Sequence, residues 1–359
     1  MRCEDIFIAG IANWLPPAVN VADAIASGSY DPHEQAANEY VSVAIAEREA
    51  PPEMAVHAGR LALERSGFRG EDIALVLHAS VWFQGVDYWP TASYVHRNVL
   101  SGSGRHAPAM DIQQMSNGGL AGVELAASYL AADPSRRAAL VTVADRYQAP
   151  GFDRWRGLPG IVYGDGAAGV VLAAGTGFAR LLAVAAISDS RLEEMHRAGE
   201  PFGPVSGHAG WPVDLRARRH AYLSDIGAKE GARRTIAGLT ESVNQALAEA
   251  ELKLGNIARV VFPNIGLAGL RRSYLEPLGL DLAVTTWEWG RRTGHVGAAD
   301  QFTALTHLVE TAHLSPGDKV MLVGIGAGFT WFSAIVELLT HPSWAVAAGS
   351  AGSAGSAAQ

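Results

Sequence analysis

The chain has 359 residues, of which 48% are hydrophobic and 18% charged, and its formal net charge at pH 7 is −8. This composition predicts a globular protein with a large buried core and excludes a nucleic-acid-binding surface, which needs clustered basic residues. The single cysteine, Cys3, excludes an internal disulfide framework and is typical of a cytoplasmic protein. The start "MRCEDIFIAG" lacks the apolar core of a signal peptide, and glycines and Arg180 interrupt the apolar region 166–187, so we expect no membrane span.

Two stretches of the chain share one order of predicted elements. Residues 54–80 combine an amphipathic helix, a glycine-containing turn and a buried strand, and residues 235–264 repeat that order, with "DIALVLHAS" matching "NIARVVFPN". Each leads on to a glycine-rich helix start, "SNGGLAGVELAASYL" or "GAADQFTALTHLVETA", and to a further buried strand. The sequence therefore predicts one α/β unit present twice, about 180 residues apart, with mixed sheets covered on both faces.

This duplication predicts an N-terminal half over residues 1–178 and a C-terminal half over residues 179–340. Residues 341–359 end in "AVAAGSAGSAGSAAQ", which cannot bury enough apolar area to offset chain entropy, so we expect a disordered tail. Residues 189–222 are rich in Arg, His, Gly and Pro. They are predicted to form an irregular connection that covers a site.

Three motifs resemble those of one known family. They are "DIQQMSNGG" (111–119), "YGDGAAGVVL" (163–172) and "LSPGDKVMLVGIGAGFTWFSAIVEL" (314–338). These stretches resemble the nucleophile turn, the end of the first half and the C-terminal strands of ketosynthase III-type enzymes. The resemblance covers residues 1–340 and implies a thiolase-like five-layer αβαβα fold built from two duplicated α/β halves. It also implies a homodimer that uses acyl-CoA as a substrate.

The catalytic positions depart from the family pattern of Cys, His and Asn. The Cys position holds Ser116, the His position in "VFPNIG" holds Asn264, and the Asn position in "TGHVGAAD" holds His295. This set resembles the priming ketosynthases of anthracycline-type aromatic polyketide pathways, which also use Ser in place of Cys. The resemblance implies that a starter acyl group, propionyl or acetyl, moves from acyl-CoA to an acyl carrier protein. It is transferred to the phosphopantetheine thiol or condensed onto a malonyl-carrier protein with loss of CO₂.

Serine before Gly-Gly at a helix start is otherwise typical of a cap, so Ser116 needs a partner to act as a nucleophile. Its alkoxide is scarce at neutral pH, and a general base must take its proton. His295 at the facing helix end is the candidate base, and Asp300, five residues on, is the candidate that orients the imidazole. The free N–H of Ser116 at a helix start would contribute to an oxyanion hole, and the resemblance implies a second N–H from Ala327.

The remaining candidates concern the substrate. His196, in the irregular middle region, is a candidate for promoting decarboxylation of a malonyl unit, and Asn264 is a candidate donor to a thioester or enolate oxygen. The resemblance implies that Trp89 enters the acyl pocket of the partner subunit, where an indole favours a short acyl chain, and that Tyr40 stacks on adenine. The candidate substrate-binding residues are Trp89, Tyr40, Arg271, Arg272, Gly326 and Gly328.

The sequence holds no Cys pair and no His pair at helical spacing beside a carboxylate, and its glycine runs match neither a Rossmann fingerprint nor a P-loop. We therefore expect no metal and no permanently bound cofactor.

Two alternatives to this acyl-transfer function stay open. A non-catalytic ketosynthase-like partner subunit fits the loss of the family's Cys and His, although the matched pair of Ser116 and His295 favours catalysis. The other is an ester- or amide-forming acyltransferase with a small hydroxylated acceptor.

Overall fold

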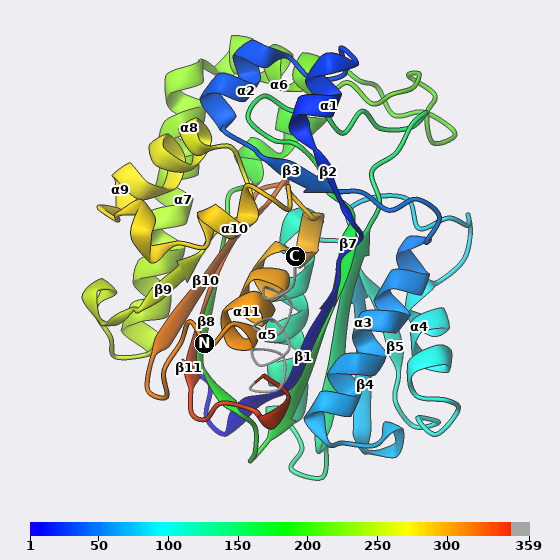
Figure 1. Cartoon of the computed structure of the whole chain (residues 1–359), viewed down its shortest axis with the longest axis vertical. Helices are drawn as coiled ribbons and strands as arrows, with labels where there is room; N and C mark the ends of the chain where they lie inside the picture. Colours follow the sequence, from blue (N-terminus) through cyan, green and yellow to red (C-terminus); the bar gives the residue numbers. More distant parts are fainter. Residues whose placement is uncertain (346–359) are drawn as a thin grey trace, which may run out of the picture.

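The computed structural model describes residues 1–345, and its largest element is one nine-stranded sheet (Figure 1). Apolar runs form the inner strands, and β6 is buried at every position. Strands buried on both faces need a covering layer on each side. In spatial order the strands are β5 (Ala109–Ile112), β4 (Ile73–Ala79), β6 (Ala138–Asp145), β7 (Gly166–Ala174), β1 (Ile6–Trp14), β8 (Ala179–Ser188), β11 (Thr330–Leu338), β10 (Lys319–Gly326) and β9 (Arg259–Val261). A separate ribbon pairs β2 (Ala18–Asn20) with β3 (Ser42–Ala44).

Helices form three layers around this curled sheet (Figure 1). α5 (Gly118–Ala131) and α11 (Asp300–Glu310) lie between its two halves and share one apolar core with strands of both. α3 (Pro51–Ser66) covers the outer face of the first half, and α7 (Ala228–Glu249) covers that of the second. This order confirms the predicted five-layer α/β arrangement. The other α-helices are α1 (Val21–Ala26), α2 (Pro32–Asn38), α4 (Thr91–Val99), α6 (Leu215–Ile226), α8 (Leu267–Leu270), α9 (Glu276–Leu278) and α10 (Trp287–Gly290).

The two halves repeat one pattern of strand pairing. β4 is parallel to β6, β6 antiparallel to β7, and β7 antiparallel to β1. In the second half β9 is parallel to β10, β10 antiparallel to β11, and β11 antiparallel to β8. The halves join where β1 pairs with β8, with Phe7 opposite Arg180. Similar sequences at 54–80 and 235–264 thus fold into equivalent units.

The starts of α5 and α11 approach each other closely. A Cβ added to Gly119 would lie only 2.7 Å from the carbonyl oxygen of Ala298, so no larger residue fits between the helices without a shift. A three-residue 3-10 turn precedes each helix, η2 (Met115–Asn117) before α5 and η7 (Gly297–Ala299) before α11. The duplicated unit thereby places two equivalent helix starts side by side.

The connection between the halves is more regular than the sequence predicted. Residues 189–222 contain η3 (Ser190–His196) and the start of α6, separated by residues 197–214 that form neither helix nor strand. The side chains of Asp189 and Asp214 cap these two pieces by accepting hydrogen bonds from the N–H groups of Arg191 and Ala217. Local capping signals explain why helices form in this segment.

The packed part of the chain extends beyond residue 340. Trp344 lies edge-on to Phe178, with ring centroids 5.7 Å apart, and the guanidinium of Arg65 lies 4.2 Å from the centre of its ring. Residues 341–345 therefore differ from the predicted tail, and the rest of that tail, 346–359, lies outside the described residues. In residues 1–345, no helix is long and apolar enough to cross a membrane.

Candidate active site

Ser116 lies on a strained turn at the start of α5. The preceding residue, Met115, has a φ of 49°, a left-handed conformation that costs a non-glycine residue about 1–3 kcal/mol. The turn η2 leads directly into α5, so Ser116 lies where free N–H groups and the helix dipole favour negative charge. Its half-buried side chain lines a cavity of about 980 Å³.

Ser116, His295 and Asp300 form one chain of hydrogen bonds. The Ser116 Oγ lies 2.9 Å from His295 Nε2, and His295 Nδ1 lies 2.5 Å from Asp300 Oδ2. An ionised carboxylate only accepts hydrogen bonds, so Nδ1 carries the imidazole proton and Nε2 is left to accept from the serine hydroxyl. This is the arrangement in which a histidine acts as a general base toward a serine.

Asp300 is completely buried, and several donors surround its carboxylate. Oδ1 accepts from the Val296 N–H at 2.7 Å and from the Asn264 side chain at 3.2 Å. Oδ2 accepts from the Asn264 N–H at 2.8 Å in addition to His295. Both oxygens of this buried side chain therefore have hydrogen-bond donors within the protein.

The main chain of His295 is held like a short strand. Its N–H donates to the Val162 carbonyl at 2.8 Å, and its carbonyl accepts from the Gly164 N–H at 2.9 Å. The next residue in the "YGDG" motif, Asp165, is completely buried and forms two 2.9 Å hydrogen bonds with the Arg154 guanidinium. This bidentate pair anchors the segment that fixes the position of the candidate base.

Hydrogen bonds attach the Ser116 turn to the start of β11. The Gln114 side chain donates to Thr330 Oγ1 at 2.9 Å, and the Asn117 side chain donates to the Thr330 carbonyl at 2.5 Å. These two residues flank Ser116 in "DIQQMSNGG". The nucleophile turn and the glycine-rich loop before β11 are therefore held in one fixed arrangement.

The glycine-rich loop also reaches the cavity. Ala327 and Gly328 line it together with Ser116, and Gly328 has a φ of 136°, which favours glycine. Gly326 lies behind the loop, where an added Cβ would collide with the Gln114 carbonyl oxygen. The oxyanion hole from the N–H groups of Ser116 and Ala327 stays a prediction, and both residues lie on the same cavity wall.

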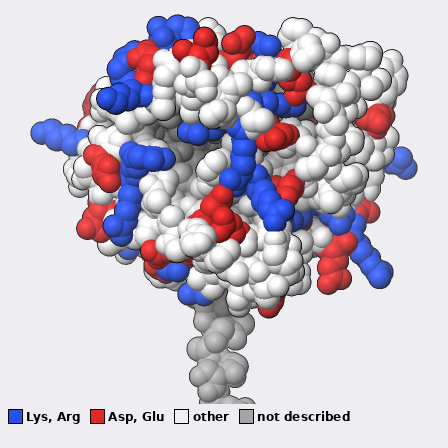
Figure 2. All heavy atoms as spheres, turned by 90° about the horizontal axis from the view of Figure 1, so that it is seen from above, with Lys and Arg blue, Asp and Glu red and all other residues white. Residues whose placement is uncertain are grey.

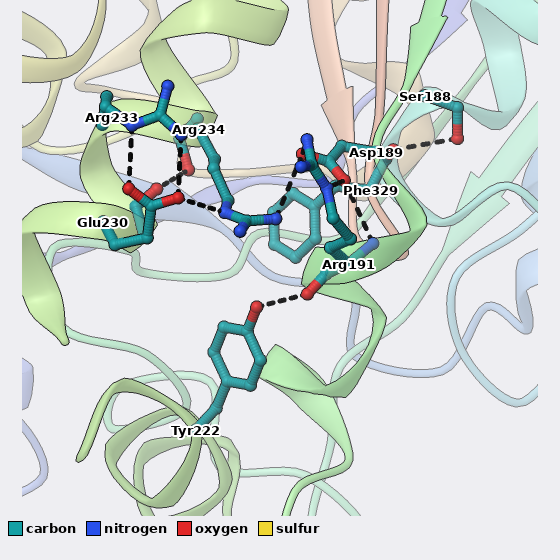
Figure 3. Close-up of polar contacts among 10 residues, drawn as sticks. Ser188, Asp189, Arg191, Tyr222, Glu230, Arg233, Arg234 and Phe329 are labelled. Atoms are coloured by element: carbon teal, nitrogen blue, oxygen red, sulfur yellow. Dashed lines mark hydrogen bonds and ion pairs between the residues drawn. The ribbon is translucent and has the colours of Figure 1, made fainter. Parts of the chain in front are cut away.

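A cluster of polar contacts supports the other side of this loop (Figure 3). The Asp189 N–H donates to the Phe329 carbonyl at 2.9 Å, and the Ser188 hydroxyl donates to the same oxygen at 3.1 Å. The Asp189 carboxylate accepts two hydrogen bonds of 2.8 Å from the Arg191 guanidinium, which keeps its pKa below the usual value. The Tyr222 hydroxyl on α6 donates to the Arg191 carbonyl. The connection 189–222 is thus tied to the glycine-rich loop before β11.

The cavity wall differs from one side to the other. Aromatic rings of the first half line the cavity near Ser116 and His295. The centroid of the Tyr163 ring lies 5.4 Å from that of the His295 ring. The arginines of the wall all come from the second half, mostly from the connection 189–222. The first-half rings are Trp82, Tyr147, Phe152 and Tyr163, and the arginines are Arg197, Arg218, Arg219 and Arg272.

The structure places His196 on the same cavity wall as Ser116 and His295. Its ring lies edge-on to Phe329 with centroids 5.8 Å apart, and its Nδ1 is buried without a hydrogen-bond partner in residues 1–345. Burial, with smaller contributions from Arg219 and Arg218, lowers the pKa of His196 to about 4. The imidazole is therefore neutral at pH 7. Its role in decarboxylation stays a prediction.

Other predicted site residues lie away from the cavity. Tyr40 is 2% exposed and its hydroxyl donates to the Asn264 carbonyl at 2.9 Å, so it is not placed to stack on an adenine. The Asn264 side chain turns toward Asp300 and the Gly294 carbonyl. Trp89 packs on Tyr94 and lies outside the cavity wall, so its predicted place in a partner's acyl pocket stays a prediction. Arg272 lines the cavity, whereas Arg271 does not.

Sequence reasoning did not find several residues that build this site. Trp82 and Phe152 lie in segments without helix or strand, where no periodic pattern indicates which side chains face a cavity. Gln114 and Asn117 flank the Ser116 position, and their amides were a usable signal for tethering. Arg219 is one of several arginines in "LRARRHAYLSDI", and the sequence does not reveal which of them turns inward.

Comparison with known proteins relates two segments of this chain to one enzyme. The family model for the C-terminal part of 3-oxoacyl-[acyl-carrier-protein] synthase III matches residues 247–338, and the model for 3-oxoacyl-[acyl-carrier-protein] synthase III matches residues 110–190. The beta-ketoacyl-[acyl-carrier-protein] synthase III of Paramagnetospirillum magneticum is 28% identical over 295 residues, covering 82% of this chain and 86% of its own.

Solved structures give the same relationship. ChlB3, described as an acyltransferase, superposes with a TM-score of 0.89 at 38% identity, covering 95% of this chain and all of its own. The 3-oxoacyl-[acyl-carrier-protein] synthase III of Aquifex aeolicus has a TM-score of 0.74 at 19% identity, covering 92% and 99%, and shows a shared fold. Within residues 1–345, no group of three or more His, Cys, Asp or Glu side chains is arranged to hold a metal ion. The chain therefore has a thiolase-like fold, is similar to 3-oxoacyl-[acyl-carrier-protein] synthase III over residues 110–190 and 247–338, and is an acyltransferase.

Proposed function

We propose that this acyltransferase, acting as a homodimer, moves a starter acyl group, propionyl or acetyl, from acyl-CoA to an acyl carrier protein and thereby primes a type II polyketide synthase. The observation that carries this proposal is the chain from Ser116 Oγ through His295 to Asp300. A matched nucleophile, base and carboxylate fit an active enzyme better than a non-catalytic partner subunit.

Acylation begins with the Ser116 hydroxyl, whose proton moves to His295 Nε2 as Oγ attacks the thioester carbonyl carbon. The resulting oxyanion lies at the start of α5, where the dipole and free N–H groups stabilise it. The C–S bond then breaks, and the imidazolium returns the proton to the departing CoA sulfur. The products are acyl-Ser116 and CoA, and His295 is again a neutral imidazole.

Transfer reverses these steps with a different thiol. The phosphopantetheine thiol of the carrier gives its proton to His295, and the sulfur attacks the acyl-Ser116 carbonyl. The C–O bond breaks, and Ser116 Oγ recovers the proton from the imidazolium. One histidine therefore serves both half-reactions, and no additional acid or base is needed for acyl transfer.

Direct transfer is favoured over decarboxylative condensation by the position of Asn264. Condensation needs a donor that stabilises an enolate oxygen in the cavity. The Asn264 side-chain amide donates instead to Asp300 and to the Gly294 carbonyl, behind the cavity wall. His196 is then the one remaining sequence-predicted group on the cavity wall for the additional step of condensation.

Two arginines of the cavity wall support an acyl donor and an acyl acceptor that both carry phosphate groups. Arg219 and Arg272 line the cavity, and burial together with the charge of Arg272 lowers the pKa of Arg219. Two cations on one cavity wall favour an anionic group beside them, such as the phosphate of a phosphopantetheine arm. The face that carries α1, α2 and α6 shows basic and acidic side chains interspersed beside a hollow (Figure 2). The arginines of the cavity wall are therefore the groups that we expect to meet the phosphate of a carrier protein.

Intact-protein mass spectrometry tests the proposal. We expect the protein to gain one propionyl group after mixing with propionyl-CoA, and Ser116→Ala to gain none. Malonyl-carrier protein or unloaded carrier protein is then added, and the mass of the carrier product separates condensation from direct transfer. If no short acyl-CoA acylates the protein, the nucleophile assignment is wrong and the partner-subunit alternative is favoured.

A further inference from the structure

Asn264 is a buried polar side chain that the acyl-transfer steps above do not use. It is 4% exposed and lies three residues after the end of β9, outside the cavity wall. Its side-chain amide donates to Asp300 Oδ1 at 3.2 Å and to the Gly294 carbonyl at 3.0 Å, and its main-chain N–H donates to Asp300 Oδ2 at 2.8 Å. One residue therefore contacts both oxygens of the carboxylate.

We propose that Asn264 and Tyr40 are positioning residues, which hold the Asp300 carboxylate in the one orientation that serves His295. The proposal rests on the proposed function, because it requires His295 to be the base for Ser116. It replaces two sequence-based expectations, a substrate contact for Asn264 and adenine stacking for Tyr40.

The orientation of Asp300 matters because its two oxygens have different tasks. Oδ2 must face His295 Nδ1, and a carboxylate free to rotate would leave the imidazole without a fixed tautomer. Oδ1 accepts from the Val296 N–H and from the Asn264 amide, so rotation would break both hydrogen bonds. A neutral amide supplies these donors without charge, whereas a cationic side chain would compete with His295 for the carboxylate.

Tyr40 links the two main-chain segments that carry this arrangement. Its hydroxyl donates to the Asn264 carbonyl at 2.9 Å and accepts from the Val162 N–H at 3.4 Å. The Val162 carbonyl in turn accepts from the His295 N–H at 2.8 Å. One phenol thus couples the position of Asn264 to that of His295, and its burial raises the pKa of Tyr40 well above the usual value.

Single-turnover acylation with propionyl-CoA separates positioning from substrate contact. Asn264→Leu keeps the approximate shape and removes the side-chain donors. We expect the saturating acylation rate to fall about 10- to 100-fold, the effect of losing one hydrogen bond to a charged group. The half-saturating propionyl-CoA concentration should stay within about twofold, because Asn264 does not reach the cavity. Tyr40→Phe should lower the rate about 3- to 10-fold.

The chain contains a matched control pair. Asn38 is also 4% exposed and donates to the Tyr30 hydroxyl at 2.9 Å, and Tyr30 is 2% exposed. Neither contacts Asp300 or His295. We expect Asn38→Leu and Tyr30→Phe to lower the melting temperature while leaving the saturating acylation rate unchanged. An equal loss of rate in the Asn38 and Asn264 variants would overturn the proposal in favour of a general structural effect.

A proton NMR measurement judges the proposal without any acyl donor. The proton on His295 Nδ1 lies in a short hydrogen bond, with 2.5 Å between Nδ1 and Asp300 Oδ2. A proton in such a bond should give a strongly deshielded signal. We expect Asn264→Leu to broaden or shift this signal and Asn38→Leu to preserve it. An unchanged signal and rate in Asn264→Leu, or a raised half-saturating concentration at an unchanged rate, contradicts the positioning role. If the wild type never acylates, the proposed function fails while the signal still decides this inference.

Discussion

The two halves of the molecule form the same turn before a helix, but the two turns carry different parts of the candidate active site. The first residue of each 3-10 turn is left-handed, with a φ of 49° at Met115 and 59° at Gly297. The second half uses glycine, for which this conformation is unstrained, whereas the first half places a methionine there. The following position holds Ser116 in one half and the small Ala298 in the other. One unit therefore presents a nucleophile, while its duplicate supplies the base and the carboxylate that serve it.

The largest expected effect breaks the pairing between the halves. His295→Ala should lower the rate of Ser116 acylation about 10²- to 10⁴-fold, since a serine hydroxyl needs a base. Ser116→Cys should reduce this dependence, because a few per cent of a cysteine is thiolate at pH 7 without help. We therefore expect His295→Ala to cost less in the Ser116→Cys background. Stopped-flow acylation by propionyl-CoA measures all four proteins, and an equal loss in both backgrounds would contradict the role of His295 as the base.

The next prediction concerns the turn itself. A Cβ added to Gly297 would lie 2.5 Å from both Asp145 Oδ2 and the Tyr147 hydroxyl oxygen, and the position has a positive φ. Gly297→Ala should therefore destabilise the protein by about 1–3 kcal/mol, the usual cost of overpacking a rigid core. Met115→Gly relieves the backbone strain at the equivalent position, but glycine also raises the conformational entropy of the unfolded chain. The two effects oppose each other, so the free energy of unfolding should change by less than about 1 kcal/mol. Urea unfolding measures both variants, and equal effects would show that the two turns do not differ in strain.

Comparing the halves also shows what the sequence could predict. The repeat and the approach of the two helix starts that carry Ser116 and His295 follow from strand patterns and motif spacing, because these are local or repeated signals. The five-layer fold follows instead from the resemblance to ketosynthase III-type enzymes. Asn264 and Tyr40 were assigned to the substrate, and the structure turns both toward the triad. Their side-chain directions depend on contacts between segments far apart in the chain, which no local pattern records. For the same reason Trp82 and Arg219 escaped detection.

The cavity walls extend the comparison, because the lining arginines all belong to the second half. Arg219→Gln and Arg272→Gln should each raise the half-saturating concentration of carrier protein about 3- to 10-fold, with a smaller effect at high salt because partly exposed charges are screened. Arg271→Gln is the matched control, since this neighbour does not line the cavity. Transfer from acylated protein to carrier protein is measured at two salt concentrations. An equal effect of Arg271→Gln would indicate a diffuse surface field rather than a defined contact.

The last expected effect is confined to acid pH and comes from a residue that only the first half has. His78 is the next-to-last residue of β4, and the matching position of the second half, just after β9, holds Phe262. The His78 ring nitrogens contact Thr142 Oγ1 at 2.9 Å and Gln84 Oε1 at 3.2 Å. Burial lowers the pKa of His78 from 6.5 to about 4. The unfolded chain therefore binds a proton between these pH values that the folded chain does not, so stability present above pH 6.5 is lost as the pH falls toward 4.

His78→Phe adopts the residue of the second half and removes this titration. The free energy of unfolding, measured by urea titration at several pH values from 7 to 4, should then depend less steeply on pH than in the wild type. The comparison uses the slope and not the absolute value, because the variant also leaves Thr142 and Gln84 without their ring partner. Lys253→Gln changes an exposed side chain that forms no ion pair within residues 1–345, and it should leave the wild-type slope intact. An unaltered slope in His78→Phe would mean that other groups, such as His196 with its pKa of about 4, account for the pH dependence.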